Sequence, residues 1–389
     1  MTHQTASPPV RRLTRPPHHH FFGYYDKSPW DPSGRYVLGM RADFRDRPPT
    51  AEDAATIGMI DTQRDDRWEA VAQTRSWNWQ QGCMLQWLPG AEEHLIVYNA
   101  RQGDRAVGVV MDAFSGEERV LPRPVYDVSP TGRVAASVSF ARIADTRPGY
   151  GYYGLEDPFR EQEAPEADGI HLMDLQSGEF RLAVSLARVA AIRHQQGMDG
   201  AKHWINHVQF APDGSRFAFL HRWREGGDHW RTRLFTADPD GADLRCLADD
   251  GVVSHYDWRD PDHVLAWARQ EGRGDRFFLF TDGAGQAEIV GEGILEGDGH
   301  CSWSPDRRWI LTDTYPGDEN MRTLILYRPD ERRRIDVGRF HSPPELSGEV
   351  RCDLHPRWSR DGRSVCFDSA HECSRQMYVA DVSQIVGGD

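Results

Sequence analysis

The sequence predicts an all-β fold, a seven-bladed β-propeller that forms a single domain over residues 1–389. Two observations predict it. A motif made of an aromatic residue, a short turn rich in Pro, Asp and Gly, and an alternating apolar run occurs seven times. Each copy is followed by a second apolar run, which in most copies ends at an Asp and a turn. Period-2 alternation between such turns is typical of antiparallel strands. Three or four strands in each unit of roughly 45–50 residues describe one propeller blade.

The aromatic position and the closing Asp define each unit. The seven motifs lie at 29–40, 86–98, 127–139, 209–221, 257–269, 302–314 and 357–369. Trp fills the aromatic position in five of the seven motifs, which is too frequent for chance. The closing acids are Asp61, Asp112, Asp174, Asp238, Asp282 and Asp381. The sixth unit has LILYRPD at this place and departs mildly from the rule.

Two segments fall outside the repeat. Residues 141–168, between the third and fourth motifs, are rich in Gly, Pro, Tyr and acidic residues. We expect a long surface loop on the third blade, a candidate lid over the open face. Residues 1–19 are expected to be flexible or extended. One role for them is to add the missing outer strand to the last blade and close the ring.

Composition excludes several classes of protein. The formal net charge is −14, which argues against nucleic acid as the main partner, because phosphate binding needs clustered basic charge. No window approaches 18 uninterrupted apolar residues, so we expect no membrane span. The first 20 residues lack the apolar core of a secretion signal, and a cytoplasmic location is the default expectation. The six cysteines form no C-x-x-C pair, and there is no G-x-S-x-G elbow, P-loop or H-E-x-x-H helix.

The repeat places histidines at one equivalent position. The residue three before the aromatic position is His in four successive units, at His207, His255, His300 and His355. Since 17 of 389 residues are His, a chance run of four is improbable. Propellers of the WD40 kind use a His to hold the loop before a strand, and this is the structural alternative. The functional interpretation is an imidazole cluster at the mouth of the central channel, able to bind a divalent metal or to carry acid–base chemistry.

Neighbouring residues extend the predicted site. Asp353 lies two residues before His355, so both side chains can face one side of an extended segment and coordinate one ion. Tyr256 follows His255 directly. We expect His221 to lie opposite His207 and Arg269 opposite the His255–Tyr256 pair, on the returning strands. A salt bridge with a nearby Asp is the alternative role of Arg269.

Four segments carry a resemblance to a known group of enzymes. They are YYDKSPWDPSGRYVL at 24–38, HWINHVQFAPDGSRFAFLHRW at 203–223, GHCSWSPDRRWILTDTYP at 299–316 and DLHPRWSRDGRSVCFDS at 353–369. With the repeat, they resemble the seven-bladed propeller polysaccharide lyases, namely the oligogalacturonate lyases and the ulvan lyases. The resemblance covers nearly the whole chain. It implies β-elimination on an acidic oligosaccharide that contains uronic acid.

The resemblance also implies roles for individual residues. In oligogalacturonate lyases manganese is held by His residues of the last blades, which fall on His300 and His355. Those enzymes carry a second His and a Gln where this chain has Asp353 and Val350. We therefore expect a divalent metal, Mn or Ca, on His300, Asp353 and His355.

Ulvan lyases use paired His, a Tyr and an Arg. The nearest counterparts here are His207, His221, Tyr256 and Arg269. His207 or His255 is expected to be the base, Tyr256 the acid or base partner, and Arg269 the carboxylate clamp. Two other functions stay open on the same fold. They are a glycoside hydrolase and a non-catalytic, protein-binding propeller of the TolB or WD40 kind.

Overall fold

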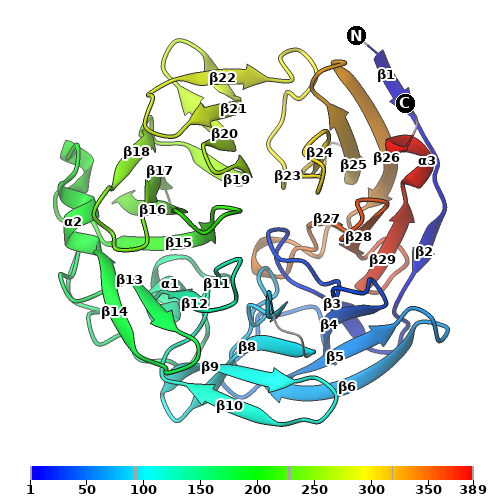
Figure 1. Cartoon of the computed structure of the whole chain (residues 1–389), viewed down its shortest axis with the longest axis horizontal. Coiled ribbons are helices and arrows are strands. Elements are labelled where there is room, and N and C mark those ends of the chain that lie inside the picture. The colour runs from blue at the N-terminus through cyan, green and yellow to red at the C-terminus, as the bar shows by residue number, and fades with distance from the viewer. Residues whose placement is uncertain (1, 91–93, 227–228, 318, 388–389) are drawn as a thin grey trace.

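The computed structural model describes residues 2–90, 94–226, 229–317 and 319–387. Seven β-sheets are arranged around a central axis, which confirms the all-β, seven-bladed propeller (Figure 1). Six sheets have four strands and one has five. In the described residues no helix is both long and apolar enough to cross a bilayer.

The first four blades follow the chain. Blade one holds β3 (His19–Phe21), β4 (Tyr36–Ala42), β5 (Ala55–Asp61) and β6 (Arg67–Thr74). Blade two holds β7 (Gln86–Trp87), β8 (Leu95–Gln102), β9 (Arg105–Asp112) and β10 (Glu118–Leu121). Blade three holds β11 (Asp127–Val128), β12 (Val134–Ser137), β13 (Gly169–Asp174) and β14 (Phe180–Ser185). Blade four holds β15 (His203–Phe210), β16 (Phe217–Gly226), β17 (His229–Ala237) and β18 (Arg245–Ala248).

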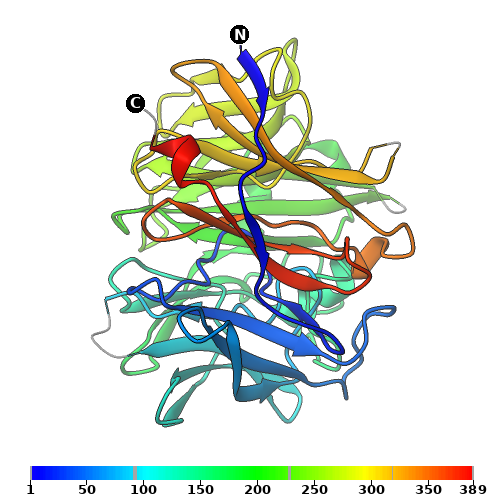
Figure 2. The same ribbon diagram turned by 90° about the vertical axis from the view of Figure 1, so that its right-hand side faces the viewer.

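The last blades take up the N-terminal strands. Blade five holds β19 (Val253–Asp260), β20 (His263–Gln270), β21 (Gly274–Thr281) and β22 (Ala287–Val290). Blade six holds β23 (Ser302–Trp303), β24 (Ile310–Asp313), β25 (Met321–Arg328) and β26 (Arg333–His341), with β1 (Thr2–Thr5) added in parallel to β26. Blade seven holds β27 (Arg357–Trp358), β28 (Ser364–Ser369) and β29 (Gln376–Asp381). Its outer strand is β2 (Val10–Arg12), antiparallel to β29, so the two ends of the chain meet in one sheet (Figure 2).

Helical segments are short. They are α1 (Phe140–Thr146), α2 (Leu186–Ala191) and α3 (Ser383–Val386), with 3-10 turns η1 (Gln196–Met198) and η2 (Gly348–Val350).

The repeated residues explain how neighbouring blades are joined. Trp87 Nε1 donates to the carbonyl oxygen of Pro29 at 2.8 Å, and Trp258 Nε1 donates to that of Gln209 at 3.2 Å. Each indole therefore bridges to the preceding blade while its ring is buried. Asp112 caps the turn of its own blade, since its Oδ1 accepts the backbone N–H groups of Phe114 and Ser115. Asp282 of blade five instead accepts from Thr236 and Arg245 of blade four. The repeated residues at these positions thus make interblade contacts and turn caps.

The segment 141–168 reaches toward the seventh blade. It begins inside α1, and Gly149 to Tyr152 are buried. The Tyr150 hydroxyl accepts a hydrogen bond from Arg351 at 2.6 Å, and the Tyr153 hydroxyl donates to Glu349. Blade three thus sends a strap to the loop before blade seven.

Candidate active site

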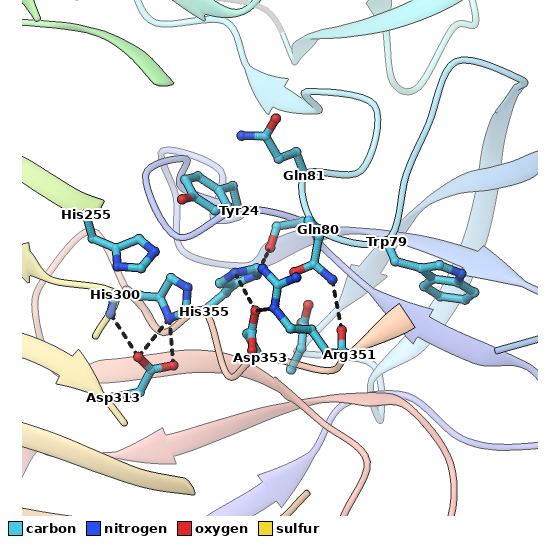
Figure 3. Close-up of polar contacts among 12 residues, drawn as sticks. Tyr24, Trp79, Gln80, Gln81, His255, His300, Asp313, Arg351, Asp353 and His355 are labelled. Atoms are coloured by element: carbon cyan, nitrogen blue, oxygen red, sulfur yellow. Dashed lines mark hydrogen bonds and ion pairs between the residues drawn. The ribbon is translucent and has the colours of Figure 1, made fainter. Parts of the chain in front are cut away.

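Four histidines from consecutive blades meet at the axis. The ring centroids of His255 and His300 lie 4.2 Å apart, and those of His300 and His355 lie 4.3 Å apart. His207 joins them through Tyr24, whose ring stacks on it at 4.8 Å and lies 5.0 Å from His355. All four imidazoles are at most 6% exposed. The convergence expected from the repeat is present, and Figure 3 shows three of these imidazoles with Tyr24.

An unusual backbone conformation orients two of these side chains, His207 and His355. His207 and His355 have φ of 53° and 41°, and Met84, at the equivalent position of blade two, has 56°. Left-handed backbone is uncommon outside glycine and persists where the surrounding structure enforces it. His207 also lies in a β-bulge, because the pairing of β15 with β16 shifts between Asn206 and Gln209. The bulge turns His207 out of the strand's regular alternation and toward the axis.

Hydrogen bonds fix the tautomer of three of these histidines. His255 Nδ1 lies 2.9 Å from Asp298 Oδ1, and His300 Nδ1 lies 2.8 Å from Asp313 Oδ1. His355 Nδ1 lies 2.8 Å from the Gly23 carbonyl oxygen. Carboxylate and carbonyl oxygens only accept, so each Nδ1 carries the proton and each Nε2 keeps a lone pair. An imidazole with its Nδ1 proton held by an acceptor and a lone pair on Nε2 is the usual arrangement at metal sites and in general bases.

His300, Asp353 and His355 form a metal-type donor set. One ligand atom from each lies within 4.8 Å of the others, and all three residues are buried. The Nε2 atoms of His300 and His355 are buried without a hydrogen-bond partner. Imidazole nitrogens and a carboxylate oxygen suit borderline divalent ions such as manganese. The residues therefore fit the divalent metal that the resemblance implies.

Asp353 is also tied to two cations. Its oxygens lie 2.7 Å from Arg322 and 2.7 Å from Arg351. Burial opposes ionisation, but the two guanidinium groups hold the pKa of Asp353 well below its usual range. The carboxylate is therefore charged and fixed in position.

Arg222 is a buried cation without a counter-ion. It lies on β16, is 4% exposed, and its Nε and one terminal nitrogen, Nη1, have no hydrogen-bond partner. Among the described residues no carboxylate lies within ion-pair distance of it. Burial, with a contribution from Arg147, lowers its pKa to about 10, so it remains charged at neutral pH. Its electrostatic neighbours include Tyr24 and Tyr150, and its charge lowers the pKa of His207. An unpaired buried charge is costly unless a ligand neutralises it.

His207 is neutral and surrounded by donors. Burial first, and then Arg222, hold its pKa well below the usual range. Its Nδ1 lies 3.4 Å from the Gln81 amide nitrogen and 3.4 Å from the Tyr126 hydroxyl. Because the amide can only donate, Nδ1 holds the lone pair and Nε2 the proton.

Two further aromatic side chains complete the cluster. Burial raises the pKa of Tyr24 well above its usual value, so the phenol stays protonated. The Tyr315 ring lies 5.7 Å from His300 and 6.2 Å from His255. Tyr315 is 38% exposed, which marks the side from which solvent reaches the cluster.

The predicted position of His221 is wrong. It pairs with Ile205, not with His207, because the bulge in β15 shifts the register. Its Nδ1 accepts from Arg233 at 3.1 Å, which leaves the proton on Nε2, directed at His203 Nδ1 2.9 Å away. Both ring nitrogens are thus occupied inside blade four.

The side chains of Tyr256 and Arg269 make structural contacts and do not take the places expected for them in the cluster. The Tyr256 hydroxyl donates to the carbonyl oxygens of His207 and Ala218, so it fixes the backbone that carries His207. Arg269 does not lie opposite His255, because its backbone N–H donates to the Val252 carbonyl. Its side chain is 51% exposed and makes a two-pronged ion pair with Asp275, the alternative role considered for it.

Sequence reasoning missed Tyr24 and Arg222. Arg222 is the neighbour of His221, and alternate strand residues face opposite sides of a sheet. The expected pairing of His221 with His207 took no account of the bulge between Asn206 and Gln209 and so selected His221 in place of Arg222. Tyr24 lies three residues before Lys27, the blade-one counterpart of the histidine position. The YYDK run at 24–27 does not recur in the other blades, so the repeat gave no indication that Tyr24 belongs to the site.

Comparisons with known proteins agree with this architecture. No family model matches the sequence, and no curated protein matches it. The oligogalacturonate lyase of Vibrio parahaemolyticus is similar, with a TM-score of 0.67 and 13% identity, over 97% of this chain and 96% of that one. An oligogalacturonate lyase in complex with manganese has a TM-score of 0.69 and 16% identity, over 99% and 96%.

Propellers of other enzymes are similar as well. The tricorn protease has a TM-score of 0.53 and 12% identity, over 95% of this chain but 35% of that one. At such identities the likeness establishes the fold. The likeness confirms that this chain and the propeller lyases share a fold. An activity has to be inferred from the residues of the site.

Proposed function

We propose that this protein is a cytoplasmic lyase that cleaves an acidic, uronate-containing oligosaccharide by β-elimination. The observation that carries the proposal is the combination around one axis. A neutral imidazole whose Nδ1 faces a carboxylate, an unpaired buried guanidinium and a metal-type donor set lie together there. Each is one requirement of the reaction, in which a carboxylate is neutralised, the C5 proton is removed and O4 leaves.

Arg222 is the proposed carboxylate clamp. Its guanidinium has no carboxylate partner among the described residues and is buried beside the histidines. A substrate carboxylate would supply the missing charge, with two parallel N–H···O bonds. This role replaces the one expected for Arg269.

His255 is the proposed base. Asp298 holds its Nδ1 proton at 2.9 Å, which directs the Nε2 lone pair outward and stabilises the imidazolium that forms. Burial lowers the pKa of His255 even though Asp298 opposes the shift, so the ring is neutral and able to accept a proton at pH 7. His207 is the weaker candidate, because Nδ1 carries its lone pair and faces Gln81 and Tyr126.

Tyr24 is the proposed acid. Its phenol is protonated and lies between His207 and His355. In the elimination, His255 takes the C5 proton, the C4–C5 double bond forms, the C4–O4 bond breaks and the Tyr24 hydroxyl protonates O4. Tyr24 then recovers a proton from solvent, and the His255 imidazolium releases the proton taken from C5 to solvent.

His300, Asp353 and His355 would hold a divalent metal, manganese or calcium. When bound, the metal would add positive charge beside the substrate carboxylate and so make the C5 proton more acidic. Manganese in a structural neighbour supports that choice.

The carboxylates of the cluster favour a lyase over a glycoside hydrolase. A hydrolase needs a carboxylic acid with a raised pKa. Here the pKa of Asp298 is lowered, with His255 the main group opposing the effect of burial, and that of Asp353 is lowered by Arg351 and Arg322.

The test is to offer oligogalacturonate, ulvan and rhamnose–glucuronate oligomers to the protein, with and without Mn or Ca. We expect ultraviolet absorbance from a 4,5-unsaturated uronate with at least one of them, and its loss in His255→Ala. New reducing ends without that absorbance would indicate a hydrolase. No product from any of the three would support a non-catalytic propeller.

A further inference from the structure

A second pocket lies between blades two and three, away from the histidine cluster. It has a volume of ≈ 180 Å³ and is lined by residues of 104–106, 122–124, 138–141, 155–159 and 167–171. The segment 122–124 joins β10 to β11, as the segments carrying His300 and His355 join their blades. The pocket therefore opens on the same face of the propeller as the cluster. We name it the rim pocket.

Three polar side chains line the rim pocket, and two of them have a buried nitrogen without a hydrogen-bond partner. His171 is 7% exposed and its Nδ1 has no hydrogen-bond partner. Arg123 Nε is buried without a partner, and within the described ranges no carboxylate makes an ion pair with this guanidinium. Asp168 is 4% exposed, and one of its oxygens, Oδ1, accepts the Gly169 N–H at 2.8 Å. Native proteins satisfy most buried polar groups, so two unpartnered nitrogens beside a buried carboxylate in one pocket indicate a ligand.

The charge state of these groups defines the ligand. Burial lowers the pKa of His171 to about 4, so the ring is neutral and offers a lone pair. Burial also lowers the pKa of Arg123, though an arginine remains cationic at neutral pH, and Asp168 supplies acceptor oxygens. Arg123, Asp168 and His171 thus present one cationic donor and two acceptors for hydroxyl groups, and three exposed charged residues, Asp104, Arg105 and Glu156, also line the pocket.

Part of the remaining wall is apolar. Phe140, Leu155 and Phe159 line it, with several prolines. Phe140 is itself fixed between Tyr126, at 5.7 Å, and Tyr152, at 4.2 Å, in a parallel stack. Such a rigid wall suits the apolar face of a small ring.

We propose that the rim pocket binds a small hydroxy-carboxylate of the acidic monosaccharide class. Its carboxylate pairs with Arg123, and its hydroxyls donate to Asp168 and His171. Its ring packs on the apolar wall. The proposal does not depend on the lyase activity, because a monosaccharide has no glycosidic bond to cleave.

The test is calorimetric titration of galacturonate into the full chain, compared with galactose, which lacks the carboxylate. Arg222→Met removes the axial clamp, so binding that persists in this variant belongs to the rim pocket. In that background Arg123→Gln is expected to weaken the affinity at least about tenfold, the usual effect of losing a hydrogen bond to a charged group. Galactose is expected to bind at least about tenfold more weakly than galacturonate.

Matched variants separate binding from folding. Arg75→Gln alters an arginine of a neighbouring pocket on the same face and should leave the affinity unchanged. His171→Phe should abolish binding while leaving the thermal midpoint unchanged or raised, since it removes an unsatisfied buried nitrogen.

Three outcomes would overturn the proposal. They are no saturable binding of galacturonate, binding that disappears in Arg222→Met alone, and equal affinities for galacturonate and galactose.

Discussion

Replacing Arg222 with Met should stabilise the protein and inactivate it. The structure gives the size of the first effect. Burial and Arg147 lower the pKa of Arg222 to about 10 from 12.5, and each unit corresponds to about 1.4 kcal/mol, so the charged form is disfavoured by about 3 kcal/mol. Met keeps much of the apolar stem, and we expect the unfolding free energy to rise by about 1 to 3 kcal/mol. For a chain of this length that corresponds to a rise of about 1 to 4 °C in the thermal midpoint.

The second effect follows from the proposed role. Removing one preorganised charge at a reacting carboxylate should reduce kcat/KM by about 10²- to 10³-fold. The assay is the initial rate of unsaturated-uronate formation on the best of the three glycans, with differential scanning calorimetry on the same samples. A variant that is more stable but less active indicates that the native residue serves function and destabilises the folded state.

The matched control is Arg269→Met. That guanidinium is half exposed and paired with Asp275, so its loss should change stability by less than about 1 kcal/mol and leave the rate unaltered. If Arg222→Met kept full activity, or lowered the thermal midpoint while Arg269→Met abolished turnover, the assignment of the clamp would be refuted.

Three further predictions concern the histidines. Asp298→Asn should lower kcat at least about 10²-fold with little change in KM, because His255 loses the acceptor that fixes its tautomer, and steady-state kinetics measures this. His300→Ala and His355→Ala should each abolish binding of Mn, measured as metal content after dialysis. Lowering the pH from 7 to 5 should decrease the unfolding free energy, measured by denaturant titration. Folding lowers the pKa of three buried histidines from 6.5 to about 4, so between pH 7 and 5 the unfolded chain binds protons at these residues and the folded chain does not. Each histidine should lower the unfolding free energy by about 1 to 2 kcal/mol. The three histidines are His20, His171 and His203.

Each of these has a decisive opposite outcome. Unchanged kcat in Asp298→Asn would remove His255 as the base. Equal manganese content in both alanine variants and in a His263→Ala control, altered far from the axis in blade five, would remove the metal site. Equal unfolding free energies at the two pH values would show that these histidines are not kept neutral by folding.

The ring of histidines was predictable because repetition converts sequence position into spatial position. Once each blade has the same strand order, residues at one offset must meet near the axis. The Trp and Asp signatures also indicated the blades, and residues such as Trp87 and Asp112 make interblade contacts and turn caps within or between neighbouring units.

The partners of those histidines were not predictable. Asp298 lies two residues before His300 but holds His255, in the preceding blade, and Asp313 holds His300. Neither pairing follows from the repeat, because Asp298 contacts a histidine of the preceding blade and Asp313 stands at a motif position that is apolar in five of the other six motifs. The bulge at His207 had the same effect on register, moving His221 into the blade and leaving Arg222 beside the cluster.

By itself, then, the sequence determined the seven blades and the meeting of four imidazoles, since both depend on a period that local patterns reveal. Only the tertiary structure decided which ring nitrogens are free, which arginine lacks a counter-ion and which tyrosine lies at the centre. Those properties depend on burial and on contacts between groups far apart in the chain, and a periodic sequence pattern predicts neither.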